Sequence, residues 1–378
     1  MSAPKSRRVA SSLGRRTLLS GATLTAAAVA LAACGFAGVS RRDPTDAPFM
    51  HGLTLAGLSG TDFAQQRAGR LVESSAATGA DWVSIAPGWY QATSDASHIS
   101  PDSARTPPDG DIRQLIDQAH AAGLRVMLKP FVNTDDGVWR GDIRPADLAT
   151  WFADYTLMTQ RYADLAAQGD ADLLCLGTDL GFSEAARAED WRKLIADVRG
   201  RFSGPLTYAA SHAPSAKLGG YADVPFWDDL DFIGINAYFP LADRQISHAQ
   251  LADAWNVWLD EIEQWRKRKG LDIPVLFTEL GYRSAATAAS QPRAADPVKP
   301  HEVDSDLQAN LYTAFFGLPY RREALQGVFW WRWDPDSTDA KDSAFPPNGK
   351  PAEAVLRRAY TAAGRRPSYS ASSSADSP

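Results

Sequence analysis

The sequence predicts a single (β/α)₈ barrel, a TIM barrel, over residues 49–364. Three observations predict it: short apolar runs recur along the chain, helical patterns lie between them, and the phosphate-binding loop of the competing fold is missing. The runs cover Gly52–Ala56, Trp82–Ala86, Arg125–Phe131, Asp172–Asp179, Leu206–Ser211, Phe232–Phe239, Pro274–Leu280 and Gly327–Trp333. Each is short and apolar enough to be buried on both faces, as the strands of a parallel sheet are.

Amphipathic patterns between these runs predict helices. Apolar side chains recur at helical spacing over 112–119, 148–166, 191–198, 255–265 and 307–315. Gly123 and Gly169 follow the first two patterns, where a helix commonly ends. Eight strands that alternate with helices fit one closed barrel.

A doubly wound open sheet is the competing fold. It carries a glycine-rich phosphate loop after its first strand, and Leu55–Gly60 is a poor match to that loop.

Composition excludes several classes of protein. The chain has 378 residues, 44% hydrophobic and 22% charged, which is ordinary globular usage and not that of a disordered or polytopic membrane chain. Its 39 basic and 45 acidic residues give a net charge of −6, which argues against a nucleic-acid partner. The 12 tryptophans are a surplus that either stacks on sugar rings or fills the core.

The first 33 residues are predicted to be an export signal. They hold Lys5, Arg7, Arg8, Arg15 and Arg16 and no acidic residue. The apolar run over 18–33 is too short and too rich in alanine for a membrane span. The Arg-Arg pair before it resembles a twin-arginine signal.

Leu31-Ala32-Ala33-Cys34 resembles a bacterial lipobox, which predicts that Cys34 carries a lipid. The alternative is an ordinary signal peptide with a chance cysteine. A lipid would anchor the protein to a membrane face without spanning it. Residues 34–48 are expected to form a tether and residues 365–378 a disordered tail. Cys175 lies in an apolar run and is interpreted as a buried, unreactive side chain.

Acidic residues stand at the ends of two predicted strands. Asp179 ends the fourth run and Glu279 lies near the end of the seventh. The active site of a barrel lies at the carboxyl ends of its strands, so these two carboxyl groups are expected to face each other. A glycosidase needs such a pair. Asp179 has a structural alternative, because aspartate is also a good helix N-cap.

Several stretches together resemble glycoside hydrolase family 113 over about residues 50–363. The matching stretches are Leu128-Lys129-Pro130, Trp139-Arg140-Gly141, Gly177-Thr178-Asp179-Leu180, Trp191 to Arg199, Leu206 to Ala210, Phe226-Trp227-Asp228, Ile233 to Leu241 and Phe277 to Ser284. The resemblance implies a (β/α)₈ barrel, hydrolysis with retention, and β-1,4-mannan as the typical substrate. It implies that Glu279 is the nucleophile and Asp179 the acid/base, that Tyr238 hydrogen-bonds the nucleophile, and that Trp331 and Trp333 form a sugar-stacking floor.

The chain departs from the family pattern in four places, all of them at strand ends. The family has Glu where this chain has Asp179, so the carboxyl group retreats by about 1.5 Å, one carbon–carbon bond. His and Asp are usual where this chain has Phe131 and Asn133, and Ser211-His212 is also unusual. These changes suggest altered substrate recognition or a loss of activity.

Further residues near strand ends are candidate substrate contacts, each with a structural alternative. They are Lys129, Trp89, Asn133, His212, Tyr282 and Trp139. Lys129 either binds a substrate hydroxyl or tunes Glu279, or it pairs with a structural acid. Arg332 is interpreted as part of a structural ion pair. The six histidines show no metal-site spacing, so neither a metal nor an organic cofactor is expected.

The sequence therefore predicts an exported, lipid-anchored glycoside hydrolase that cleaves β-glycosidic bonds with retention. Its expected partner is a polysaccharide or oligosaccharide substrate. The protein is expected to contact the membrane only through the lipid and to be a monomer. Two alternatives stay open. One is a glycan-binding lipoprotein with little or no activity, and the other is a barrel that processes exopolysaccharide within a secretion assembly.

Overall fold

A computed structural model describes residues 48–212, 220–242, 248–294 and 302–362. The chain divides into two units, Met1–Arg42 and Asp43–Pro378, and every described residue belongs to the second. The predicted export signal, the lipidation site Cys34 and the C-terminal tail lie outside the described residues. Among the helices that are described, none is long and apolar enough to cross a membrane.

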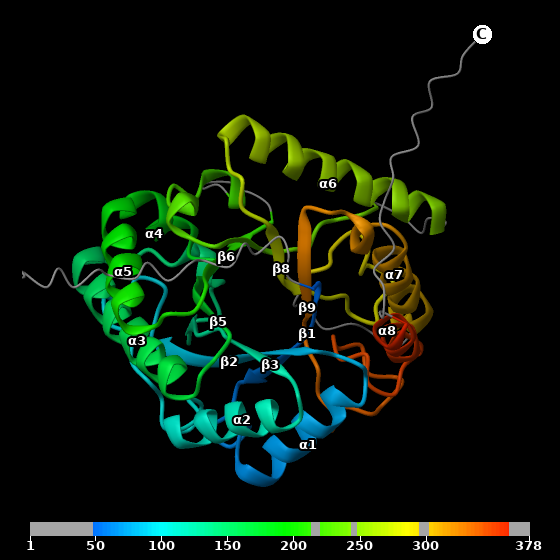
Figure 1. Ribbon diagram of the computed structural model, residues 1–378, viewed down its shortest axis with the longest axis horizontal. Coiled ribbons are helices and arrows are strands. Elements are labelled where there is room, and N and C mark those ends of the chain that lie inside the picture. The colour runs from blue at the N-terminus through cyan, green and yellow to red at the C-terminus, as the bar shows by residue number, and fades with distance from the viewer. Residues whose placement is uncertain (1–47, 213–219, 243–247, 295–301, 363–378) are drawn as a thin grey trace, which may run out of the picture. The chain divides into compact units, whose positions relative to one another are not determined.

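The described strands close into an eight-stranded parallel barrel, which confirms the predicted fold class (Figure 1). They are β1 (Met50–Gly57), β2 (Trp82–Gln91), β3 (Arg125–Leu128), β4 (Phe131–Thr134), β5 (Leu173–Thr178), β6 (Leu206–Ser211), β7 (Phe232–Asn236), β8 (Val275–Leu280) and β9 (Leu325–Trp330). Adjacent barrel strands pair in parallel, and β1 pairs with both β2 and β9, which closes the ring. The short strands β3 and β4 are two parts of the third barrel strand, since both pair with β2.

The break in the third barrel strand falls at Lys129-Pro130. Pro130 has no backbone N–H to donate to the sheet, so the ladder cannot continue through it. The Lys129 N–H still donates to the Ile85 carbonyl at 2.8 Å. The predicted run Arg125–Phe131 therefore spans a kink, and the kink lies where the strand reaches the mouth of the barrel.

Helices cover the outside of the barrel (Figure 1). They are α1 (Gln65–Ala76), α2 (Asp109–Ala121), α3 (Leu148–Gln168), α4 (Gly181–Ala186), α5 (Ala188–Arg201), α6 (His248–Lys269), α7 (Ser305–Gly317) and α8 (Pro351–Thr361). The five predicted helical patterns correspond to α2, α3, α5, α6 and α7. The sequence patterns did not single out α1, α4 and α8.

Two hydrophobic clusters hold these layers together. The outer cluster lies between the strands and the helices. The inner cluster takes side chains from strands alone, so it fills the barrel itself: Met50, Trp82, Met127, Leu173, Cys175, Ala209, Phe232, Leu276 and Phe329. Burial raises the pKa of the Cys175 thiol to about 11, which agrees with its interpretation as an unreactive core residue. The barrel is thus a packed core, and a ligand has access to its mouth.

Candidate active site

Both oxygens of the Glu279 carboxylate are held by buried partners at the mouth of the barrel. The Lys129 ammonium forms an ion pair with Oε1. The Tyr238 hydroxyl donates a hydrogen bond of 2.9 Å to Oε2. Lys129 is 1% exposed and Glu279 6%, so little water competes with these contacts. The arrangement stabilises an ionised carboxylate in a fixed orientation.

The fold delivers each of these partners from a strand end. Lys129 occupies the kink between β3 and β4, inside the barrel and beneath Glu279. Tyr238 lies two residues beyond β7, where its N–H donates to the Asn236 carbonyl at 3.0 Å. The structure places Lys129 in direct contact with Glu279. This contact favours the interpretation that Lys129 tunes Glu279 over a pair with a structural acid.

Asn236 links the two strands that carry the candidate carboxyl groups. Its amide Nδ2 donates to Thr178 Oγ1 at 2.8 Å, and its Oδ1 accepts from Thr278 Oγ1 at 3.1 Å. Thr178 precedes Asp179 and Thr278 precedes Glu279, so the hydrogen-bond chain runs directly below both acids. All three side chains are at most 1% exposed. The sequence analysis did not identify Asn236 as a site residue.

Asp179 follows β5 in a left-handed backbone conformation, with φ of 54°. Aspartate is one of the few residues with a side chain that tolerate this region. The Asp179 N–H donates to the Ala209 carbonyl at 2.9 Å, which anchors it to β6. The short helix α4 that follows has Leu180 at its N-cap position and no side-chain cap. The N-cap alternative for Asp179 is therefore wrong.

The Asp179 carboxyl group is buried, and among the described residues its Oδ1 has no hydrogen-bond partner. Burial raises its pKa, the charge of Arg293 opposes that rise, and the charge of Glu279 adds to it. An acid in such a place favours its protonated form. Two carboxyl groups in such different surroundings at one barrel mouth are the kind of pair that glycoside hydrolysis uses.

Two arginines lie at the mouth close to Asp179. The Arg293 guanidinium lies 4.0 Å from the centre of the Trp139 ring and donates to Ser211 Oγ at 3.3 Å. The Arg140 guanidinium lies 4.7 Å from the centre of the Phe131 ring and donates to Asn133 Oδ1 at 2.6 Å. The predicted substrate contacts Trp139 and Asn133 thus bind arginines in this structure. Arg293 was not identified from the sequence.

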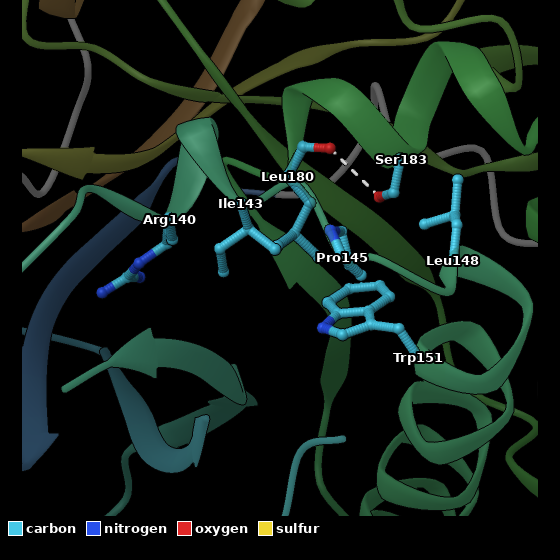
Figure 2. A pocket seen from close by; sticks show the side chains of 7 residues that line it. All are labelled: Arg140, Ile143, Pro145, Leu148, Trp151, Leu180 and Ser183. Atoms are coloured by element: carbon cyan, nitrogen blue, oxygen red, sulfur yellow. Dashed lines mark hydrogen bonds between the residues drawn. The ribbon is translucent and has the colours of Figure 1, made fainter. Parts of the chain in front are cut away.

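Arg140 also borders a small pocket beside Asp179 (Figure 2). The pocket is lined by Arg140, Ile143, Pro145, Leu148, Trp151, Leu180 and Ser183. Figure 2 shows the Arg140 guanidinium directed away from Leu148 and Trp151, and the Ser183 hydroxyl donating to the Leu180 carbonyl at 3.0 Å. Apolar side chains thus pack under Leu180, which follows Asp179. The guanidinium group of Arg140 points away from these apolar side chains (Figure 2).

His212, just beyond β6, is a neutral side chain in this environment. Burial and then the positive charge of Arg293 lower its pKa to about 3. Within the described part of the chain its Nδ1 has no hydrogen-bond partner. The same part of the chain contains no group of three or more His, Cys, Asp or Glu side chains that fits a metal ion.

Three predicted substrate contacts lie in the outer cluster instead, on the helix side of the sheet: Trp89, Tyr282 and Trp333. Trp333 is 2% exposed and its indole donates to Ser74 of α1 at 2.9 Å. Tyr282 is fully buried, and Trp89 faces Arg161 of α3. The structure therefore separates Trp333 from the partly exposed Trp331, and the expected shared floor is wrong for Trp333.

Arg332 lies between these two tryptophans in the sequence and forms an ion pair with Asp334 at 3.6 Å. This contact agrees with the structural interpretation of Arg332.

A buried glutamate that the sequence analysis missed anchors the loop after Asp179. Glu184 of α4 is 3% exposed and accepts a hydrogen bond from the Tyr208 hydroxyl. The same hydroxyl accepts from the Leu180 N–H at 2.8 Å. Burial raises the pKa of Glu184 to about 8, so the carboxyl group is largely protonated at neutral pH. No spacing in the sequence marks this residue, because its partner comes from β6.

The chain is similar to known proteins over most of its described length. The model of Glycoside Hydrolase Family 113 matches residues 55–349. A solved β-mannanase of that family from Alicyclobacillus acidocaldarius, in complex with ManMIm, shares 28% sequence identity and superposes with a TM-score of 0.73. The match covers 84% of this chain and 99% of that one.

Other solved structures are similar as well. A complex of another family 113 β-1,4-mannanase shares 26% identity, with a TM-score of 0.72 over 84% of this chain and 100% of that one. A family 5 enzyme from Streptomyces cattleya, in complex with Manβ1-4GlcNAc, shares 17% identity. Its TM-score is 0.56 over 85% of this chain and 82% of that one, a similarity of fold alone. Among proteins with curated descriptions, none matches the chain significantly.

Replacing Tyr238 by phenylalanine tests the contact to Glu279. The change removes one hydrogen bond to a charged carboxylate, which is worth roughly 1.5–3 kcal/mol. We expect kcat to fall about 10- to 100-fold in a steady-state assay. Tyr282→Phe is the matched control, because the Tyr282 hydroxyl is buried with no hydrogen-bond partner among the described residues. Equal losses in the two variants would contradict the assignment.

Replacing Glu184 by glutamine tests the buried carboxyl group. Its pKa is about 8 in the folded protein and ordinarily 4.5, so its contribution to stability is full below pH 4.5 and lost as pH rises through 8. The free energy of unfolding should fall by roughly 3–4 kcal/mol between pH 5 and 8 on this account. Urea titrations should show a flatter pH dependence in Glu184→Gln than in the wild type. The exposed control Glu73→Gln should keep the wild-type slope, and parallel curves for all three proteins would contradict the account.

Proposed function

The chain belongs to glycoside hydrolase family 113, and on that premise we propose that it hydrolyses β-1,4-mannan or manno-oligosaccharides with retention of configuration. The observation that carries the proposal is the environment of Glu279, whose two oxygens contact the Lys129 ammonium and the Tyr238 hydroxyl. A nucleophilic carboxylate must be ionised, oriented and shielded from water. These contacts meet all three needs.

In the proposed first step, Glu279 attacks the anomeric carbon and Asp179 gives its proton to the leaving oxygen. The carbon–oxygen bond to the leaving sugar breaks, and an ester bond between the sugar and Glu279 forms. Lys129 and Tyr238 hold the attacking carboxylate in one orientation, which lowers the entropic cost of bringing the reacting atoms together. In the second step Asp179 takes a proton from water, and that water releases the sugar from Glu279.

The burial of Asp179 supports its role as the acid. A carboxyl group whose pKa is raised by burial still holds its proton at a pH at which an exposed aspartate has lost it. Its buried Oδ1 has no hydrogen-bond partner among the described residues, so no contact with them competes for a proton on this oxygen. The left-handed backbone sets the direction of this short side chain.

The choice of mannan rests on the solved relatives. The two family 113 structures with 26% and 28% identity are described as β-mannanases, and both matches cover 84% of this chain. Asp179, Phe131 and Asn133 depart from the family pattern at strand ends, so the experiment on substrate choice compares several β-glycans.

A panel of reduced-end-labelled β-glycan oligosaccharides tests the proposal, with Glu279→Gln as the control. We expect the wild type to cleave β-1,4-manno-oligosaccharides and the control to be inactive. The anomeric proton of the first product, followed by NMR, should show the β configuration. An α product would contradict retention. Binding without cleavage by either protein would favour the glycan-binding alternative.

We also propose that the protein is exported and anchored by a lipid on Cys34. The basic start, the apolar run over 18–33 and the lipobox-like Leu31-Ala32-Ala33-Cys34 support this. Metabolic labelling with a radioactive fatty acid tests it in bacterial cells. We expect label in the wild type and in the Cys175→Ser control, and none in Cys34→Ser. Label that persists in Cys34→Ser would contradict the anchor.

A further inference from the structure

Arg293 and Arg140 lie at the mouth of the barrel without an ion pair to a carboxylate of the described residues. Within residues 48–212, 220–242, 248–294 and 302–362, neither forms an ion pair. Other arginines of the same chain are paired: Arg192 contacts Asp228 and Asp229, and Arg322 contacts Asp260 and Glu263. The chain has more acidic than basic residues, so the lack of an ion pair at these two arginines does not reflect a lack of carboxylates in the chain.

The partners of these two arginines are neutral, so they orient the guanidinium groups without cancelling their charge. Arg293 lies against the Trp139 ring and the Ser211 hydroxyl, and Arg140 against the Phe131 ring and the Asn133 amide. An aspartate at position 133 would pair with Arg140, whereas asparagine accepts the hydrogen bond and leaves the charge in place.

The Trp139 ring carries the Arg293 guanidinium, and Trp139 directly precedes Arg140 in the sequence. The ring also lies against the backbone of Gly141, where a Cβ atom would come within 2.1 Å of it. A ring held in this way is a support for Arg293 more than an open platform for a sugar.

Both charges act on the candidate acid. Arg293 and Arg140 each lower the pKa of Asp179 against the effect of burial, and Arg293 also lowers that of His212. His212 is neutral at physiological pH, so it adds no charge of its own. The contacts of the two guanidinium groups place them on either side of Asp179. Arg140 is held by Asn133 of β4 and Arg293 by Ser211 at the end of β6, and Asp179 follows β5, which lies between the third barrel strand and β6.

We propose that Arg293 and Arg140 bind a carboxylate on a sugar next to the scissile bond, so that the natural substrate is an acidic β-glycan. A neutral mannan offers these charges no partner, whereas the planar guanidinium fork matches a carboxylate, with two parallel N–H···O bonds. The inference rests on the proposed glycosidase activity and specifies its substrate class.

Two matched oligosaccharide pools test this inference. One contains β-1,4-manno-oligosaccharides, and the other is the same pool partly oxidised at C6, so that some units are mannuronate. We expect the full-length wild type to show a kcat/KM about 10- to 100-fold higher on the oxidised pool, as for other charged hydrogen-bonded contacts. Added salt should reduce that preference.

Variants of the two arginines test whether these side chains cause the preference for the oxidised pool. Arg293→Gln and Arg140→Gln should each abolish most of it, measured within each variant as the ratio of kcat/KM on the oxidised pool to kcat/KM on the neutral pool. This ratio cancels the effect of the lost charge on Asp179, which acts on both pools alike. Asn133→Asp should act like Arg140→Gln, because it supplies the missing carboxylate without removing the arginine. Arg201→Gln is the control for net charge, since Arg201 is an outer arginine of α5 that pairs with Asp164 and Asp197.

Equal rates of the wild type on the two pools would overturn the inference. So would variants that slow both pools alike, because the arginines would then only hold the rim loops and Asp179. If the wild type cleaves neither pool, the proposed activity fails, and calorimetric binding decides the inference separately. Tighter binding of the oxidised pool that Arg293→Gln abolishes would support it, and equal affinities would overturn it.

Discussion

The hydrogen-bond chain from Thr178 through Asn236 to Thr278 is the constraint on which the site depends. It joins β5, β7 and β8 one residue below the two carboxyl groups, and it is closed to water. Buried, fully paired polar groups fix one arrangement, because any slip of a strand would leave a donor or acceptor unpaired. The Asn236 amide thus ties the ends of β5 and β8, which carry Asp179 and Glu279, to β7. The inner core of the barrel gives this amide its dry surroundings.

The two carboxyl groups then differ because their neighbours differ. Glu279 receives an ammonium and a hydroxyl group, both of which favour a carboxylate. Asp179 is buried, and one of its oxygens has no partner in the described part of the chain, which favours the protonated form. This division of roles comes from the surroundings and not from the residue types. Around this pair the mouth is positively charged, since Lys129 is committed to Glu279 while Arg140 and Arg293 keep neutral partners.

Sequence reasoning predicted the barrel and the positions of the carboxyl groups, because both follow from patterns along the chain: buried runs at regular intervals and acids at their ends. It was wrong where that pattern stops. Successive side chains of a strand point to opposite faces of the sheet, so Trp331 and Trp333 would share a face if the strand continued through them. Strand β9 ends at Trp330, and the alternation therefore does not apply to these two residues. The pairing of β8 with β9 shifts register between Phe277 and Leu280, and Tyr282 lies beyond the end of β8. The pattern of the strand therefore does not predict which way Tyr282 points. Asn236, Glu184 and Arg293 gained their roles from partners far away in the sequence, which no local spacing reveals.

The central claim is that Glu279, held by Lys129 and Tyr238, attacks the sugar and forms a covalent intermediate. Mass spectrometry after treatment with a 2-deoxy-2-fluoro glycosyl fluoride of the cleaved sugar tests it most directly, because the fluorine slows release of the sugar from the enzyme. The account predicts one added fluorosugar per protein, on the peptide that contains Glu279, and none on Glu279→Gln. An adduct on another residue, or turnover of the normal substrate by Glu279→Gln at the wild-type rate, would contradict it.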